Sequence, residues 1–127
     1  MLPTFMRIHA LLLVVFGLAF WVVPGPLRML SLYGVPADGW EVVAFARLLG
    51  VFALSFAALL WTASRLPDAS LHAIARTVCV LQWVGGALVL IQQYAIWNNP
   101  TGALTVALFV LLAGAYSVGL TRKPLDG

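Results

Sequence analysis

A long uncharged stretch constrains this chain more than any other feature. No Asp, Glu, Lys, Arg or His occurs between Thr77 and Thr121. Hydrophobic residues make up 63% of the chain and charged residues 9%, whereas soluble domains have about 45–50% and about 25%. A soluble fold of 127 residues has too little polar surface to cover such a segment. The sequence therefore predicts a single domain, residues 1–127, with the lipid bilayer as its solvent.

Four segments have the roughly 20 mostly apolar residues that a transmembrane helix needs. They are residues 5–23, 40–61, 71–93 and 101–120. The predicted fold class is all-α, a membrane-embedded bundle of four transmembrane helices. Residues 26–35, in the loop between the first two spans, are too apolar to be fully exposed to water. We expect them to form a short helix that lies at the membrane interface.

The amino-terminal apolar run has features of a signal peptide, because it follows Arg7 and extends to Leu27. It ends, however, in Val22-Val23-Pro24-Gly25-Pro26, where a small-x-small cleavage signal is absent. We therefore expect this segment to be a retained first helix.

Residues that favour helix starts precede three of the spans. Asp38 and Glu41 have the spacing of a capping box before the second span. Asp68 is predicted to cap the third span. Asn99 followed by Pro100 predicts a cap and a first-turn proline for the fourth. The three acids also lie where the helix dipole favours negative charge.

Basic residues in the short loops predict the direction of the spans, because cytoplasmic loops carry an excess of Lys and Arg. An amino terminus in the cytoplasm places five of them on that side and only Arg28 on the other. The five are Arg7, Arg65, Arg76, Arg122 and Lys123. The sequence predicts a multi-pass protein of the cell membrane with both termini cytoplasmic. The basic residues form no stripe or groove, which argues against a nucleic-acid partner.

Small residues on the second span predict its main helix contact. Ala46, Gly50, Ala53 and Ala57 are spaced by four, three and four residues, so they share one face. Helices in a bilayer associate through close backbone approach at such residues. Packing within the bundle is the favoured interpretation, and contact with a second copy or another membrane protein is the alternative.

Arg47 is the most informative polar residue. It lies seven positions into the second span, roughly 10 Å from the boundary at 1.5 Å per residue. A charge at the centre of a span costs about 2.5–3.5 kcal/mol on the insertion scale, and such residues usually face the bundle or a wet cavity. Two interpretations remain open: Arg47 reaches the headgroups, or it forms a binding site with Gln92, Gln93 and Tyr94 at similar depth.

The remaining polar residues of the spans are weaker candidates. Gln82 either bonds across helices or lines a cavity, and it is kept as a candidate ligand-binding residue. His9 and His72 fall near the cytoplasmic boundary, where two facing imidazoles can hold a haem iron, but solvated imidazoles are favoured. Cys79 is the only cysteine and has no thiol partner. No metal site or cofactor is evident.

Several four-span classes do not fit these residues. A small multidrug exporter needs a glutamate in its first helix, and this first span has none. A vitamin K epoxide reductase-like enzyme needs paired cysteines. A fluoride channel usually has polar Asn and Gly patterns in its spans and often dual topology, which the charge bias opposes.

The order of several short motifs resembles that of the DoxX-like small four-helix membrane proteins. The motifs are His9-Ala10-Leu11-Leu12, Phe16-Gly17-Leu18, Pro24, Leu32-Tyr33-Gly34-Val35 and Arg47-Leu48-Leu49-Gly50. The resemblance covers nearly the whole chain, and Arg47 with Gly50 is its most specific part. It implies a compact four-helix bundle and a link to quinone redox chemistry.

Three function classes follow from these features. The favoured one is a non-catalytic membrane protein, either an accessory subunit or a protein that binds a lipid or small amphipathic molecule near Arg47. The second is a membrane subunit of a quinone-linked oxidoreductase, with Arg47, Gln92 or Tyr94 near the quinone headgroup. The third, a small transporter, is disfavoured because the spans hold no titratable acid.

Overall fold

The computed structural model describes residues 1–22, 25–34 and 39–121, with the backbone alone at residues 25–27 and 97. These residues form helices and turns, and no strand occurs among them. The helices are α1 (Leu2–Trp21), α2 (Gly25–Leu32), α3 (Trp40–Ala63), α4 (Asp68–Gln92), the π-helix η1 (Gln93–Trp97) and α5 (Pro100–Leu120).

Within the described residues, four helices are long and apolar enough to cross a membrane. They are α1, α3, α5 and the continuous segment of α4 and η1, Asp68–Ile96. This confirms the predicted all-α fold with four spans. The short helix expected at residues 26–35 is present as α2.

Two of the predicted helix caps are wrong. Gly39 occupies the N-cap of α3, so the helix begins one residue later than the predicted capping box requires, and Asp38 lies outside the described residues. At α4 the N-cap is Pro67, whose backbone is extended (ψ 153°), so the helix begins at Asp68, one residue earlier than a cap at Asp68 requires. Asp68 lies in the first turn, where the helix dipole still stabilises its negative charge.

The predicted cap of the fourth span is confirmed. Asn99 has an extended backbone, and its Oδ1 accepts a hydrogen bond of 2.8 Å from the Gly102 amide. Pro100 occupies the first helical position. There its missing N–H leaves no helix hydrogen bond unmade.

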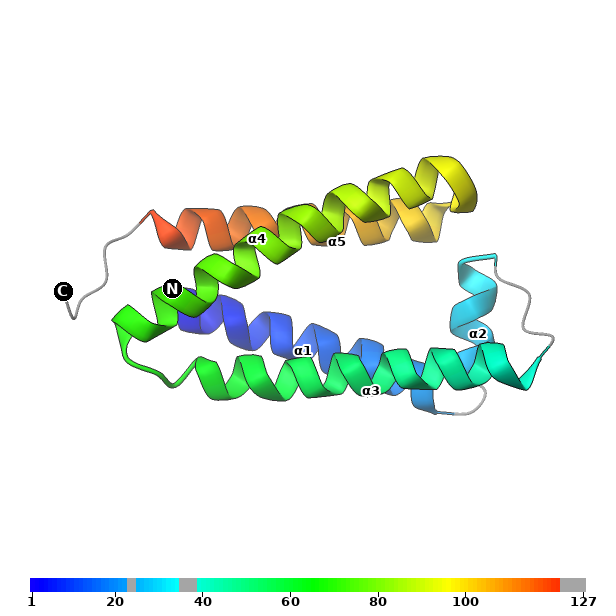
Figure 1. The fold of residues 1–127 in the computed structure, drawn as a ribbon, viewed down its shortest axis with the longest axis horizontal. Helices are drawn as coiled ribbons and strands as arrows, with labels where there is room; N and C mark the ends of the chain where they lie inside the picture. Colours follow the sequence, from blue (N-terminus) through cyan, green and yellow to red (C-terminus); the bar gives the residue numbers. More distant parts are fainter. Residues whose placement is uncertain (23–24, 35–38, 122–127) are drawn as a thin grey trace.

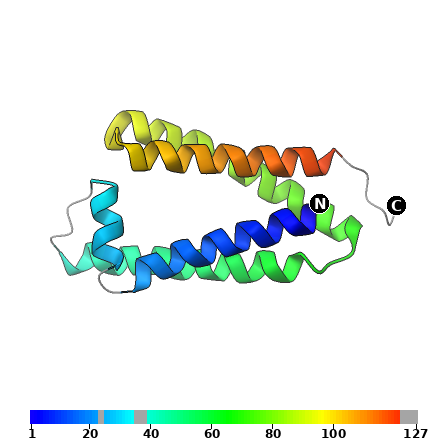
Figure 2. The ribbon, with the colours of Figure 1, turned by 180° about the vertical axis from the view of Figure 1, so that it is seen from behind.

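The long helices form two pairs that meet at one end of the molecule (Figures 1 and 2). The helix α1 packs along α3, and α4 packs along α5. Both pairs come together at the end where α1 begins and α5 ends, and they diverge toward the end that holds α2. We call these ends the termini end and the α2 end.

The first pair is held by close backbone contact between glycines. A methyl group built on Gly50 would lie 2.8 Å from the carbonyl oxygen of Gly17, and one built on Gly17 would lie 2.9 Å from the carbonyl oxygen of Gly50. Gly50 lies on a face of α3 whose other small residues are also buried: Ala46, Ala53 and Ala57. This face lets α1 approach within a distance that larger side chains would prevent.

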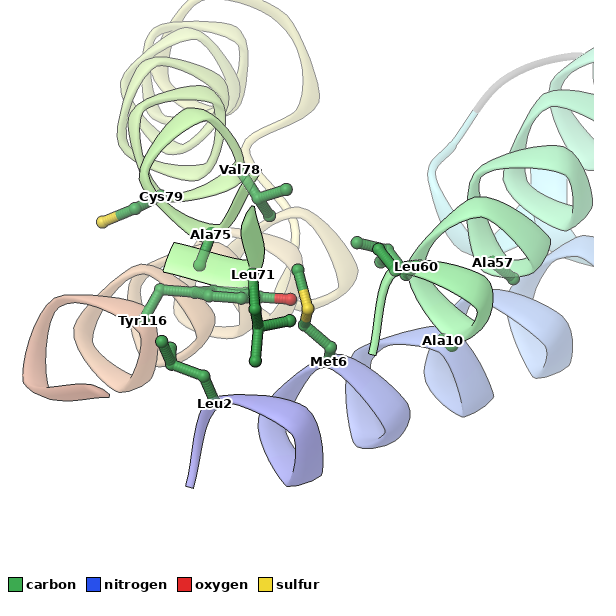
Figure 3. Packing of buried hydrophobic residues seen from close by; sticks show 11 residues of the cluster. Leu2, Met6, Ala10, Ala57, Leu60, Leu71, Ala75, Val78, Cys79 and Tyr116 are labelled. Atoms are coloured by element: carbon green, nitrogen blue, oxygen red, sulfur yellow. The ribbon is translucent and has the colours of Figure 1, made fainter. Parts of the chain in front are cut away.

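The two pairs join through a buried cluster at the termini end (Figure 3). Tyr116 of α5 extends between Met6 of α1 and Leu71 of α4, with Leu60 of α3 beside them. These four are the largest fully buried side chains of the described part of the chain. Cys79 also belongs to the cluster, but its sulfur points away from the centre.

At the α2 end, hydrogen bonds connect Tyr33, the residue after α2, to the second pair. The Thr105 hydroxyl donates to the Thr101 carbonyl, so it accepts from the Tyr33 hydroxyl at 2.6 Å. The Asn99 side-chain amide donates to the Tyr33 carbonyl at 3.0 Å. The segment that follows α2 is thereby attached to α5, although α2 itself is linked in sequence to the first pair.

Candidate functional site

An apolar groove runs along one side of α3. It consists of two neighbouring hollows of about 490 and 480 Å³ that share Phe56 and Leu59. The first lies over α1 and α3 and is lined by Leu13, Phe16, Leu49, Phe52, Ala53, Ser55, Phe56 and Leu59. The second lies between α3 and α4 and is lined by Phe56, Leu59, Leu60, Thr62, Ala63, Leu66, Ile74, Thr77, Val78 and Leu81. We call the two together the α3 groove.

The position of the groove follows from the pairing of the helices. The helices α3 and α4 are consecutive in the chain, but each packs along a different partner. Their facing side chains therefore remain partly uncovered, and Leu59 is 68% exposed. From Leu49 to Ala63 the groove follows α3 for about 21 Å at 1.5 Å per residue. It is longer than half the roughly 30 Å hydrocarbon core.

The chemistry of the lining favours binding through apolar contact. Its polar side chains are the hydroxyls of Ser55, Thr62 and Thr77. The hydroxyls of Ser55 and Thr77 donate to carbonyls one turn earlier in their own helices. A long hydrocarbon chain matches such a lining, because it demands no hydrogen bonds.

A buried polar pair lies directly behind the groove. His9 of α1 and Tyr116 of α5 share a hydrogen bond of 2.9 Å between Nδ1 and the hydroxyl. Phe56, a groove residue, meets the His9 ring edge-on with centroids 5.7 Å apart. The His9 side chain is only 2% exposed. The His9–Tyr116 hydrogen bond therefore connects α1 to α5 directly behind the lining residue Phe56.

Three arginines of the described chain lie in α1, in the turn after α3 and in α4: Arg7, Arg65 and Arg76. Arg65 precedes the lining residue Leu66, and Arg76 precedes the lining residue Thr77. Both arginines are exposed, and neither makes an ion pair or side-chain hydrogen bond with another described residue. Arg7 is different, because its Nε donates to the Ser64 hydroxyl at 3.2 Å and its guanidinium stacks over Trp61.

Arg47 lies away from the groove. It precedes Phe52 by five residues, which is about 140° around the helix. Its guanidinium lies over the Trp21 ring of α1, 5.6 Å from the centroid. Its Nε is buried and has no hydrogen-bond partner in the described part of the chain. Arg47 thus lies at the side of the α1–α3 pair, where it makes a cation–π contact with the Trp21 ring.

The other predicted ligand residues do not gather around Arg47. Gln93 donates from Nε2 to the Asn99 carbonyl at 2.8 Å, while its buried Oε1 has no partner among the described residues. Gln92 is half-buried, and Tyr94 is 81% exposed. Gln82 is buried within the second helix pair. None of the four forms a hydrogen bond with Arg47 in the structure as described.

The two histidines do not act together. His9 is bonded to Tyr116, whereas Nδ1 of His72 bonds to the Asp68 carbonyl in its own helix. No cluster of three or more His, Cys, Asp or Glu suitable for a metal occurs among the described residues. The Cys79 thiol lies 3.3 Å from the Ser117 hydroxyl, which also accepts from the Trp83 indole at 3.1 Å.

Sequence reasoning found the polar residues but missed the groove and the His9–Tyr116 pair. Arg47 stood out as a single charge in an apolar span. The groove has no such signal, because its residues are ordinary apolar residues of a membrane helix. Its existence depends on which helices pair, and neither periodicity nor loop length determines that.

Comparisons with protein-family models, curated proteins and solved structures found no match to this chain. The likeness to DoxX-like proteins therefore remains a prediction from the motifs around Arg47 and Gly50.

Proposed function

We propose that this chain is a non-catalytic protein of the cell membrane that holds one amphipathic molecule in the α3 groove. Both termini would lie in the cytoplasm, since the termini end carries the excess of arginine. The observation that carries the proposal is the two joined apolar hollows along α3, the second of which lies between the two helix pairs. Its lining holds hydroxyls as its polar groups, which suits binding rather than chemical conversion.

The test is native mass spectrometry of the full chain, extracted from its own membrane in mild detergent. The wild-type protein is expected to carry one defined added mass. Leu59→Trp places a bulky ring in the groove and should remove that mass. Leu111→Trp is the matched control, because Leu111 is also 68% exposed but lies on α5 outside the groove lining.

The identity of the added mass separates the function classes. A lipid or other non-redox amphiphile supports the proposal. A quinone that Leu59→Trp removes would instead favour a quinone-linked oxidoreductase subunit. A bare wild-type chain, or a mass that both tryptophan variants retain, would contradict binding in the groove.

A second candidate function, an accessory subunit of a larger membrane complex, is favoured by Arg47. The buried Nε of Arg47 has no hydrogen-bond partner among the described residues, which is costly in a bilayer, and an acid on a neighbouring protein would pair with it. Arg47→Leu should then leave insertion and groove binding intact but remove the complex from a native gel of solubilised membranes. Leu48→Ala, at the exposed neighbouring position, should keep it. An unchanged complex in Arg47→Leu would exclude this role for Arg47.

A further inference from the structure

We propose that Tyr33 is a latch at the α2 end of the bundle and that the buried cluster at the termini end is the matching hinge. When the latch opens, the two helix pairs move relative to each other at the α2 end and stay joined at the termini end. This device requires no bound molecule, so it stands or falls independently of the proposed function. It is carried by the contrast between the contacts that join the pairs at their two ends (Figures 1 and 2).

The contact at the termini end is apolar and closely packed. Tyr116 of α5 lies between Met6 of α1 and Leu71 of α4, and all three side chains are fully buried. Leu60 of α3 lies beside them, so each of the four long helices contributes a large side chain. A close-packed interior of this kind resists separation. The pairs can therefore rotate about this cluster without coming apart there.

The contact at the α2 end is small and polar. The helix α2 packs against α1 and α3 of the first pair, and Tyr33, the residue after it, bonds to the second pair. The Tyr33 hydroxyl donates to the Thr105 hydroxyl at 2.6 Å, and the Tyr33 carbonyl accepts from the Asn99 side-chain amide at 3.0 Å. All three residues are only partly buried. Polar contacts between membrane helices are individually weak, so these two can break while the helices remain intact.

A polar atom without a partner lies next to the latch. Gln93 donates from Nε2 to the Asn99 carbonyl at 2.8 Å, but its buried Oε1 has no hydrogen bond within the described part of the chain. A buried acceptor without a hydrogen bond destabilises the arrangement that buries it. The latched state is therefore less stable than a fully bonded contact would be, which favours its opening.

The experiment measures distances between the two pairs by double electron–electron resonance on the full chain in nanodiscs. One pair of spin labels replaces Phe45 of α3 and Leu104 of α5, near the α2 end. A second pair replaces Ile8 of α1 and Val118 of α5, near the termini end. All four positions are exposed. The labels are carried by non-canonical amino acids, so the native cysteine stays unchanged.

Two variants open the latch in different ways. Asn99→Asp keeps an oxygen that caps α5, but it sets a carboxylate against the Tyr33 carbonyl in place of the amide donor. The double variant Tyr33→Phe/Thr105→Val removes the other hydrogen bond and changes the side-chain volumes little. Asn98→Asp is the matched control, because it makes the same substitution at the exposed neighbouring position.

Both latch variants should shift or broaden the distance between positions 45 and 104, and Asn98→Asp should leave it unchanged. Phe45 lies about 22 Å along α3 from Leu60 in the hinge, so a rotation of about 10° moves it by about 4 Å. The distance between positions 8 and 118 should stay the same in every variant. If neither latch variant changes the first distance, the latch is overturned. An equal change in the second distance would mean that the whole fold loosens, and it would overturn the hinge.

Discussion

At the residue scale, the hydrogen bond between His9 and Tyr116 is a polar contact between the two helix pairs. Tyr116 is fully buried, and its hydroxyl lies 2.9 Å from Nδ1 of His9. Apolar burial does not drive helices together inside a bilayer, so packing and such polar contacts hold the pairs together. His9 and Tyr116 are 107 residues apart in sequence, so their hydrogen bond connects the first long helix, α1, to the last, α5.

Tyr116→Phe should therefore destabilise the fold, although it changes the side-chain volume little. It removes the hydroxyl and leaves a buried imidazole nitrogen without its partner. The expected loss is about 1–2 kcal/mol of unfolding free energy, measured by steric trapping in bicelles. Tyr94→Phe is the control, because Tyr94 is largely exposed. Equal stability of the two variants would mean that the hydrogen bond adds nothing to the fold.

At the element scale, α1 and α3 form the tightest contact of the bundle. Their backbones meet at Gly17 and Gly50, where an added methyl group would strike a carbonyl oxygen of the other helix. A flexible side chain can move aside, but a helix backbone moves only together with its neighbours. The contact is therefore sensitive to a single carbon atom.

Gly50→Ala is expected to push α1 away from α3. It should lower the free energy of unfolding by about 1–3 kcal/mol, as overpacking of a close contact does. The measurement is the shift of the unfolding midpoint in an SDS titration of the purified protein. Gly114→Ala is the matched control, because a methyl group built on Gly114 meets nothing within 4 Å. If Gly50→Ala shifts the midpoint no more than Gly114→Ala, the close contact does not stabilise the pair.

The sequence predicted the elements better than their arrangement. The four spans, the short helix α2 and the Asn99 cap follow from hydropathy and from local side-chain chemistry. The buried face of Ala46, Gly50, Ala53 and Ala57 follows from helical periodicity. The caps at Asp38 and Asp68 were wrong because backbone geometry at Gly39 and Pro67 determined the first turn.

At the scale of the whole molecule, the proposed function depends on how the two pairs are arranged. They share a buried cluster at the termini end and a hydrogen-bonded contact through Tyr33 at the α2 end. The α3 groove lies between these two attachments. Sequence reasoning left open a ligand site around Arg47, because a charge is conspicuous in an apolar span. In the structure Arg47 lies over the Trp21 ring, on another side of α3 from the groove.

The most direct test of groove occupancy is photocrosslinking in the native membrane. A diazirine amino acid replaces either Leu81 in the groove lining or Val118 on α5, which are 53% and 57% exposed. One dominant amphiphile-sized adduct is expected at position 81, and a broad mixture, in proportion to membrane composition, is expected at position 118. The same broad mixture at both positions would show that the groove holds bulk lipid only, and it would contradict binding of one defined molecule in the α3 groove.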